Sequence, residues 1–291
     1  MFTRAVCSFD CDAPRRWSPS TLLRGSALVH VGAALGVAAW PASWPLALGL
    51  VVANQALLLL AGLLPRCRWL GPNLTRLPAF AAERGEVALT FDDGPDPAIT
   101  PRVLDLLEDA GARATFFCVG QALARQPELA REMVRRGHLI ENHTASHPLA
   151  FSAYGWRRMA AEIADGQRLI EQTTGRTPRF FRAVAGLRNP LLDPLLARQG
   201  LRLTAWTRRG YDACCRDPER VLRRLTHRLA AGDILLLHDG HAARTAQGEP
   251  VVLAVLPRLL AELKARGLRP VTLAAACQTA TPATALAGAA A

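Results

Sequence analysis

Lysine is almost absent from this chain of 291 residues, although its formal net charge is +11. Lys264 is the only lysine, so arginine carries almost all of the positive charge. The chain also lacks a basic run interleaved with aromatic residues, and we therefore expect no nucleic-acid partner. Anionic lipid head groups and phosphorylated substrates stay compatible with the charge. Hydrophobic residues make up 50% of the sequence and charged residues 20%, which excludes a disordered chain.

The sequence has no repeated cysteine-pair spacing. Its seven cysteines lie at positions 7, 11, 67, 118, 214, 215 and 277. Cys7 and Cys11 lack a second pair that would complete a zinc cage, and the adjacent Cys214 and Cys215 would form only a strained bridge. We interpret all seven as free thiols, which mildly favours a reducing compartment.

Charged residues are missing from residues 25–65. As one helix this segment would rise about 60 Å, at about 1.5 Å per residue, which is roughly twice the hydrocarbon thickness of a bilayer. Two prolines and two tryptophans interrupt it at residues 40–45, as expected for a turn at the membrane boundary. We predict a transmembrane hairpin over residues 22–65, with helices at roughly 22–40 and 46–64.

Two other interpretations of this segment stay open. The first apolar run is also compatible with a signal peptide, although the second run would then remain as an anchor. A buried core hairpin is the other alternative, but its helices would need a polar face, to which Asn54 and Gln55 contribute little.

The arginines near the hairpin are distributed unevenly. None lies in the short connection, and six flank the outer ends, at positions 15, 16, 24, 66, 68 and 76. The positive-inside rule then places both termini, and the domain that follows, in the cytoplasm of a bacterial inner-membrane protein. If the first helix does not span, the domain lies on the opposite side.

After the hairpin, short apolar runs alternate with amphipathic segments. The runs expected to be strands are residues 87–91, 114–119, 139–140, 180–181, 201–206, 234–237 and 271–273. Helical periodicity covers residues 101–109, 127–136, 156–173, 218–229 and 252–266. This alternation predicts an α/β fold with a mainly parallel sheet, closed or nearly closed as a barrel of about seven strands.

The predicted organisation has five parts. An N-terminal tail (1–21) precedes the hairpin (22–65), and a linker (66–85) leads to the α/β domain (86–275). An Ala/Thr tail, which we expect to be disordered, ends the chain (276–291).

Polar residues cluster directly after the predicted strands. They are Asp92, Asp93, His143, His147, Arg182, Asp212, His238 and Asp239. Because parallel strands place their carboxyl ends at one edge, these residues are expected to converge on one site.

The first motif is TFDDGPDP over residues 90–97. Two adjacent carboxylates at the end of an apolar strand are costly unless a cation compensates them, and Gly-Pro then forces a turn. One carboxylate is suited to bind a metal while its neighbour acts as a base. A turn with capping aspartates is the alternative for this motif taken alone.

The second motif is HTASH over residues 143–147. A spacing of four places two imidazoles on one side of a helical turn, which suits a divalent metal ion. Two histidines with one aspartate form a facial set that leaves positions open for water and substrate oxygen. Taken alone, a pair of histidines at this spacing is structural or due to chance about as often as it binds a metal ion.

Together the two motifs resemble the polysaccharide deacetylase family, the NodB-like domains of carbohydrate esterase family 4, over roughly residues 86–273. The resemblance implies a distorted NodB-like (β/α) barrel. It implies that Asp93, His143 and His147 bind one divalent metal ion, Zn²⁺ first, with Co²⁺, Ni²⁺ or Mn²⁺ as alternatives. Asp92 would then be the general base.

The family's third motif is an arginine followed by prolines and an aromatic residue, and here it reads RAVAG over residues 182–186. The resemblance implies that Arg182 pairs with Asp92 and orients it. The prolines and the aromatic residue of that motif are missing here. The backbone N–H of Ala185 is still expected to serve as an oxyanion donor, since this needs no side chain.

Trp206 with Asp212 resembles the family's fourth motif, and LLH over residues 236–238 resembles its fifth motif. In the family the tryptophan lines the acetyl pocket, the aspartate tunes the last histidine, and that histidine, here His238, is the general acid. A core position is the alternative for Trp206, because large aromatic residues are usually buried.

The resemblance implies a metal-dependent hydrolase of linear amide bonds, an N-deacetylase of an N-acetylated sugar in a cell-envelope polysaccharide or lipid-linked glycan. The expected partners are that glycan or lipid-linked sugar and membrane lipid. One alternative is a deacylase or deformylase of a lipid-linked amino sugar on the cytoplasmic face. Another is a catalytically inactive sugar-binding membrane protein.

Overall fold

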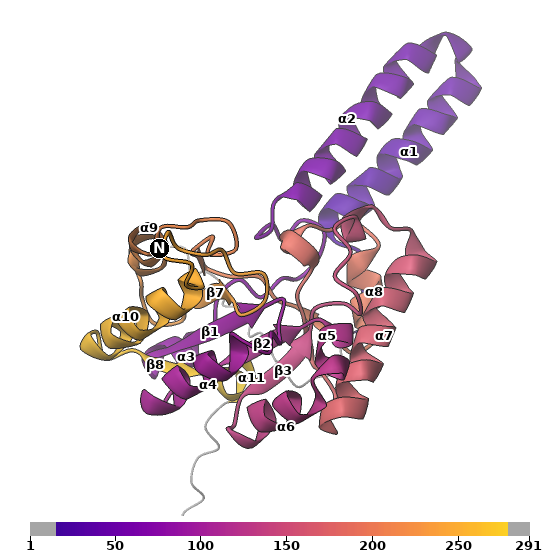
Figure 1. Cartoon of the computed structure of the whole chain (residues 1–291). Coiled ribbons are helices and arrows are strands. Elements are labelled where there is room, and N and C mark those ends of the chain that lie inside the picture. The colour runs from indigo at the N-terminus through magenta and orange to yellow at the C-terminus, as the bar shows by residue number, and fades with distance from the viewer. Residues whose placement is uncertain (1–15, 279–291) are drawn as a thin grey trace, which may run out of the picture.

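The computed structural model describes residues 16–278, which form a curled parallel sheet flanked by helices and a long helical hairpin that projects from it (Figure 1). Most of the predicted N-terminal tail and of the predicted Ala/Thr tail lies outside the described residues. Ala276 and Cys277 belong to a helix, so the folded domain extends slightly beyond the predicted boundary at residue 275.

The sheet has eight strands in the order β5-β4-β3-β2-β1-β7-β6, with β8 paired to β1. Every strand pair is parallel. The strands are β1 (Glu86–Asp92), β2 (Thr115–Cys118), β3 (Leu139–Asn142), β4 (Phe180–Phe181), β5 (Arg202–Leu203), β6 (Arg208–Arg209), β7 (Ile234–His238) and β8 (Arg269–Val271).

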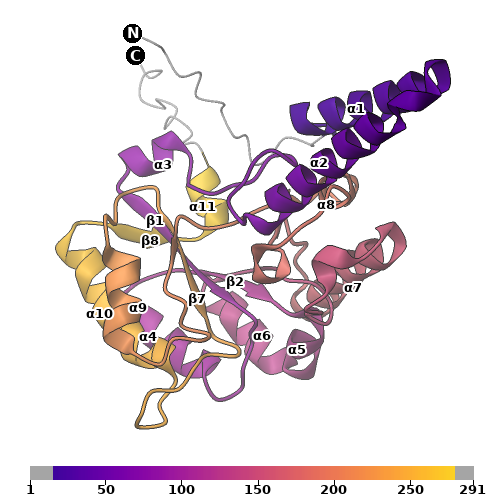
Figure 2. The same ribbon diagram turned by 90° about the horizontal axis from the view of Figure 1, so that it is seen from above.

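Helices surround the curled sheet (Figure 2). They are α3 (Ala79–Glu83), α4 (Thr100–Asp109), α5 (Gly120–Arg125), α6 (Pro127–Arg135), α7 (Trp156–Thr174), α8 (Leu192–Arg198), α9 (Pro218–Thr226), α10 (Val251–Ala265) and α11 (Leu273–Cys277). The five helices predicted from periodicity are α4, α6, α7, α9 and α10. The other four are too short to show a period of 3.6 residues.

The sheet is a half-barrel, which corrects the prediction of a closed or nearly closed barrel of seven strands. The predicted strand 201–206 ends at Leu203, and the polar β6 has no apolar signal. Among the described residues β5 and β6 do not pair. Residue Leu74 of the linker fills part of the gap, because its N–H donates to Leu203 O (2.9 Å) and its carbonyl accepts from Ala205 N (2.9 Å).

Alternate residues of β1 face opposite sides of the sheet. Val87, Leu89 and Phe91 pack in an outer core with residues of α4 and α10, and Ala88 lies in the inner core. Each large apolar side chain contributes about 1.5–3 kcal/mol when buried, so a slip of one residue would be costly. The register that buries this outer face also directs Asp92 to the inner side at the end of the strand.

The projecting hairpin consists of α1 (Thr21–Ala39), a 3₁₀ turn (Pro41–Ser43) and α2 (Trp44–Leu63). The bounds agree with the predicted helices within two residues. Both are long and apolar enough to cross a membrane, and only 6% and 22% of their apolar windows are buried. This exposure excludes the alternative of a buried core hairpin.

Polar residues of the two hairpin helices bond to one another, and the Asn54–Ser26 pair is buried between the helices. Asn54 Nδ2 donates to Ser26 Oγ (2.8 Å), and Gln55 Nε2 lies 3.1 Å from His30 Nε2. The outward faces carry apolar side chains, and Trp40, at the tip, is 70% exposed. This polarity is the reverse of that in the α/β domain, where the apolar side chains are inside.

The structure corrects the prediction that all seven cysteines are free thiols. Cys277 is disulfide-bonded. Cys67, Cys118, Cys214 and Cys215 are free. A single disulfide leaves no repeated spacing, so the sequence pattern gives no sign of it. Because disulfides persist in oxidising compartments, the predicted preference for a reducing one loses its support.

Candidate active site

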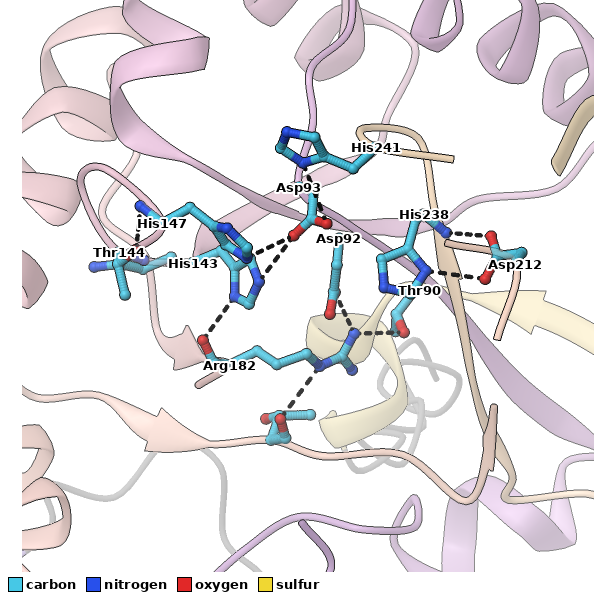
Figure 3. Close-up of polar contacts among 12 residues, drawn as sticks. Thr90, Asp92, Asp93, His143, Thr144, His147, Arg182, Asp212, His238 and His241 are labelled. Atoms are coloured by element: carbon cyan, nitrogen blue, oxygen red, sulfur yellow. Dashed lines mark hydrogen bonds and ion pairs between the residues drawn. The ribbon is translucent and has the colours of Figure 1, made fainter. Parts of the chain in front are cut away.

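Three predicted metal ligands meet at the carboxyl end of the sheet (Figure 3). Asp93 follows β1, and His143 and His147 lie in the loop after β3. Asp93 Oδ1 is 3.2 Å from His143 Nε2 and 3.0 Å from His147 Nε2. One donor atom from each residue lies within 4.8 Å of the others, which confirms the predicted Asp/His/His grouping.

The two histidines converge through a loop, which corrects the expectation of a helical turn. Thr144 and His147 have φ angles of 72° and 53°. The side chain of Asn142 accepts from Thr144 N (2.8 Å), and Thr144 Oγ1 accepts from His147 N (3.0 Å). These bonds hold a left-handed backbone that residue spacing alone does not predict.

The orientation of the His143 ring suits a metal ion. His143 Nδ1 donates to the carbonyl of Arg182 (2.7 Å), which directs Nε2 toward Asp93. Burial raises the pKa of Asp93, but the hydrogen bonds from His143 and His147 outweigh burial and hold this pKa well below its usual range. One carboxylate and two imidazoles form a donor set that fits Zn²⁺ or a similar divalent ion.

On one side of the cluster, Asp92 pairs with Arg182 as predicted. Arg182 Nη1 donates to Asp92 Oδ1 (2.6 Å) and to Thr90 Oγ1 (2.8 Å). The guanidinium is fully buried and lies 4.0 Å from the centre of the Phe117 ring. Burial lowers the pKa of Arg182, and the charge of Asp92 opposes this shift. Arginine stays charged in such surroundings, so it fixes the position of the Asp92 carboxylate.

A second buried ion pair joins His238 and Asp212. His238 ends β7 directly opposite Asp92 in the sheet register. Asp212 accepts from His238 N (2.7 Å) and from His238 Nδ1 (2.9 Å). Burial lowers the pKa of His238, but the charge and hydrogen bond of Asp212 outweigh burial and raise this pKa to about 9. The imidazole is thus a protonated group near neutral pH.

The loop after Arg182 brings together the last two predicted residues. Ala185 has a φ of 54°, and no acceptor in the described part of the chain pairs with its N–H. Trp206 is buried in the inner core, and it also lines a cavity beside the site. A Cβ atom at Gly186 would lie 2.6 Å from both Pro65 and Trp206. Pro65 therefore lies beside residues 182–186, the motif that departs from the family pattern.

Two residues at the site have no role in the sequence-based prediction. His241 Nδ1 lies 3.5 Å from Asp93 Oδ2, and its ring stacks on His147 with centroids 5.9 Å apart. Asp239 is fully buried, accepts from Thr100 Oγ1 (2.6 Å), and has a pKa raised by burial to about 7. In the sequence, their position directly after His238 is the signal that could have placed them at the site.

Comparisons with known proteins agree with this site. Residues 81–204 match the polysaccharide deacetylase family. A peptidoglycan-N-acetylglucosamine deacetylase of Bacillus cereus is 34% identical over 189 residues, which cover 64% of this chain and 85% of that protein. A chitooligosaccharide deacetylase of Sinorhizobium fredii is 33% identical over 200 residues, which cover 67% of this chain and 93% of that protein.

A solved structure shares the fold as well as the sequence. The family 4 carbohydrate esterase of Streptomyces lividans, in complex with acetate, has 33% sequence identity and a TM-score of 0.58. The match covers 64% of this chain and 91% of the esterase. With the Asp/His/His cluster in place, these similarities show that the chain belongs to the polysaccharide deacetylase family, whose members are hydrolases of N-acetyl amide bonds.

Proposed function

We propose that this protein is a divalent-metal-dependent N-deacetylase that hydrolyses the acetamide group of an N-acetylated sugar. One observation carries the proposal: the Asp93/His143/His147 cluster lies beside a buried Asp92–Arg182 pair and a buried His238–Asp212 pair (Figure 3). Amide hydrolysis needs a group that accepts a proton from water and a group that donates one to the leaving amine.

Each residue then has a distinct part in the reaction. When bound by Asp93, His143 and His147, a divalent ion such as Zn²⁺ polarises the amide carbonyl and lowers the pKa of water. Asp92 accepts the proton of the attacking water, and Arg182 holds its carboxylate in place. The N–H of Ala185 donates to the developing oxyanion. His238 protonates the departing nitrogen, so that one water and one amide give acetate and a free amino sugar.

The hairpin supports a membrane location for this activity. Its outward side chains are apolar, its polar residues bond to one another, and tryptophans lie at the tip and near the base. Such aromatic belts are typical of residues at the two membrane interfaces. We propose that α1 and α2 span a bacterial inner membrane and that Trp206 contributes to the substrate pocket of a domain held at its surface.

Two observations bear on the side of the membrane. The arginine distribution predicts the cytoplasmic side. The disulfide of Cys277 is typical of an oxidising compartment, outside the cytoplasm. An alkaline phosphatase fusion after Arg76 distinguishes them, because this reporter is active only outside the cytoplasm.

The proposed activity is tested on the full-length protein in detergent, with acetate release from an N-acetylated chitooligosaccharide as the measurement. Chelation should abolish acetate release, and added Zn²⁺ should restore it. The variant His143→Ala/His147→Ala should stay inactive after Zn²⁺ is added, which controls for ions bound elsewhere. Acetate release that survives both chelation and this double substitution would contradict the proposal. An inactive wild-type protein that binds the sugar would favour the sugar-binding alternative.

A further inference from the structure

A cavity of about 740 Å³ lies where the hairpin meets the α/β domain. One wall is the segment 64–69, which directly follows α2. The other wall comes from the chain around β6, with Trp206, Thr207, Arg209 and Tyr211. The cavity therefore lies between the membrane hairpin and the candidate active site.

Three arginines line this cavity, and no acidic residue does. None of Arg66, Arg68 and Arg209 forms an ion pair with a carboxylate in the part of the chain that the structure describes. Other arginines of the domain do, such as Arg182 with Asp92. Unpaired guanidinium groups that face one cavity favour an anionic ligand, because each presents several donors that match phosphate oxygens.

Arg209 is the best-held of the three arginines. Its guanidinium lies 5.1 Å from the centre of the Trp206 ring and 4.8 Å from that of Tyr211. Its Nε is buried and has no hydrogen-bond acceptor. Arg66 is fixed less tightly, by a bond from its Nη1 to Thr207 O (3.2 Å). A buried donor without an acceptor costs about 1–3 kcal/mol, and an anionic ligand would supply the acceptor.

The cavity lies next to the proposed reaction site. Trp206 lines the cavity, and its ring lies 5.9 Å from the Arg182 guanidinium. Tyr211, also in the lining, directly precedes Asp212, which holds His238. A sugar whose nitrogen lies near His238 is therefore within reach of the cavity.

The cavity also lies at the level where the hairpin would enter the bilayer. Trp69 in its wall is 56% exposed, and Trp17, before α1, is 43% exposed. Leu63 and Leu64, at the end of α2, are exposed as well. Exposed tryptophans beside apolar residues are typical of the membrane interface, which is where the phosphate groups of lipids lie.

We propose that this cavity binds the phosphate or diphosphate that links an N-acetylated sugar to a membrane lipid, with Arg209 and Arg66 as its ligands. This inference rests on the proposed deacetylase function and names its substrate class. The sugar lies toward Trp206 and His238, and the lipid chain follows the apolar surface of α2 into the bilayer. A soluble oligosaccharide without phosphate would make no use of these arginines.

The test uses full-length protein in phosphatidylcholine nanodiscs and two substrates, N-acetylglucosaminyl diphosphate polyprenol and N-acetylated chitotriose. The variant Arg66→Gln/Arg209→Gln should raise KM for the lipid-linked substrate by about tenfold or more, and leave hydrolysis of chitotriose unchanged. Arg131→Gln, at an exposed position of α6, is the matched control and should change neither. Equal effects on both substrates, or no effect on the lipid-linked one, would overturn the proposal.

A second measurement separates this proposal from the proposed activity. Native mass spectrometry of the protein in detergent should show one lipid-linked sugar bound to wild type and far less bound to the double arginine variant. If wild type binds the lipid-linked sugar in this way but releases no acetate, the deacetylase function fails and the phosphate site stands. If phosphatidylglycerol without any sugar binds equally well, the cavity is a lipid head-group site and the inference fails.

Discussion

Two buried carboxylates lie beside the Asp/His/His cluster, and each pairs with a cation of a different kind. Asp92 pairs with Arg182 at 2.6 Å, and Asp212 pairs with His238 at 2.9 Å. All four side chains are at most 6% exposed. The two pairs are thus similar in burial and in donor–acceptor distance, and they differ in whether the cation can release a proton.

This difference separates the two chemical parts of the site. Arginine does not lose its proton in a protein, so Arg182 fixes and charges its partner without taking part in proton transfer. Asp92 is therefore the member of its pair that can accept a proton. Histidine titrates, so Asp212 favours the protonated form of His238, and His238 is the member of its pair that can donate a proton.

Replacing the acceptor should have the largest effect on turnover. We expect Asp92→Asn to lower kcat by about 10²–10⁴, because the amide still accepts a hydrogen bond from Arg182 but cannot take a proton from water. The measurement is acetate release at saturating Zn²⁺. The zinc content should stay at the wild-type value, which shows that the cluster is intact. Turnover near the wild-type rate would remove Asp92 from the role of base.

Replacing the arginine should affect stability as well as activity. Arg182→Met leaves the buried Asp92 without its counter-charge, a change that typically costs about 3–5 kcal/mol. For a domain of this size, this corresponds to a fall in Tm of about 10 °C. The double variant Arg182→Met/Asp92→Asn should recover part of the loss, since it no longer buries a lone charge. Equal melting temperatures for the single and double variants would show that Arg182 does not stabilise the fold through its ion pair with Asp92.

On the acid side, the partner of His238 should control the pH dependence. The pKa of His238 is raised to about 9, so the donor form is present below this pH and activity should fall as pH rises through it. In Asp212→Asn, the charge and the hydrogen bond that oppose burial most strongly are lost, and the pKa should fall toward about 6.5, the usual value for histidine. The alkaline limb of kcat should therefore move down by about two pH units, while the Asp92 variant should show a smaller shift.

Much of this site could be predicted from the sequence, because its residues follow strands with strong apolar signals. β1 and β7 are fully buried, and their pattern fixes where Asp92 and His238 fall. Parallel strands then bring residues that are far apart in the sequence to one edge. This topology and the resemblance to a known family were enough to predict the Asp/His/His grouping.

The features that the sequence did not reveal depend on contacts between distant segments. The approach of Pro65 to Gly186 and the arginine cavity both join parts of the chain that no local pattern connects. β6 consists of two arginines and has no strand signal. Left-handed backbone at residues such as Ala185 is likewise fixed by its surroundings, since the residue type does not favour it.

A third histidine, His241, lies close to the Asp/His/His cluster, and its replacement tests whether it is a further metal ligand. His241 Nδ1 lies 3.5 Å from Asp93 Oδ2, which is longer than a well-formed hydrogen bond, and the side chain is 72% exposed. We expect His241→Ala to lower zinc affinity only about twofold, as for an exposed charge pair of about 0.5 kcal/mol, whereas His147→Ala should remove stable binding. Competition with a chromogenic chelator measures both variants. A loss with His241→Ala as large as that with His147→Ala would make His241 a fourth ligand, and the site would then leave fewer positions for water and substrate.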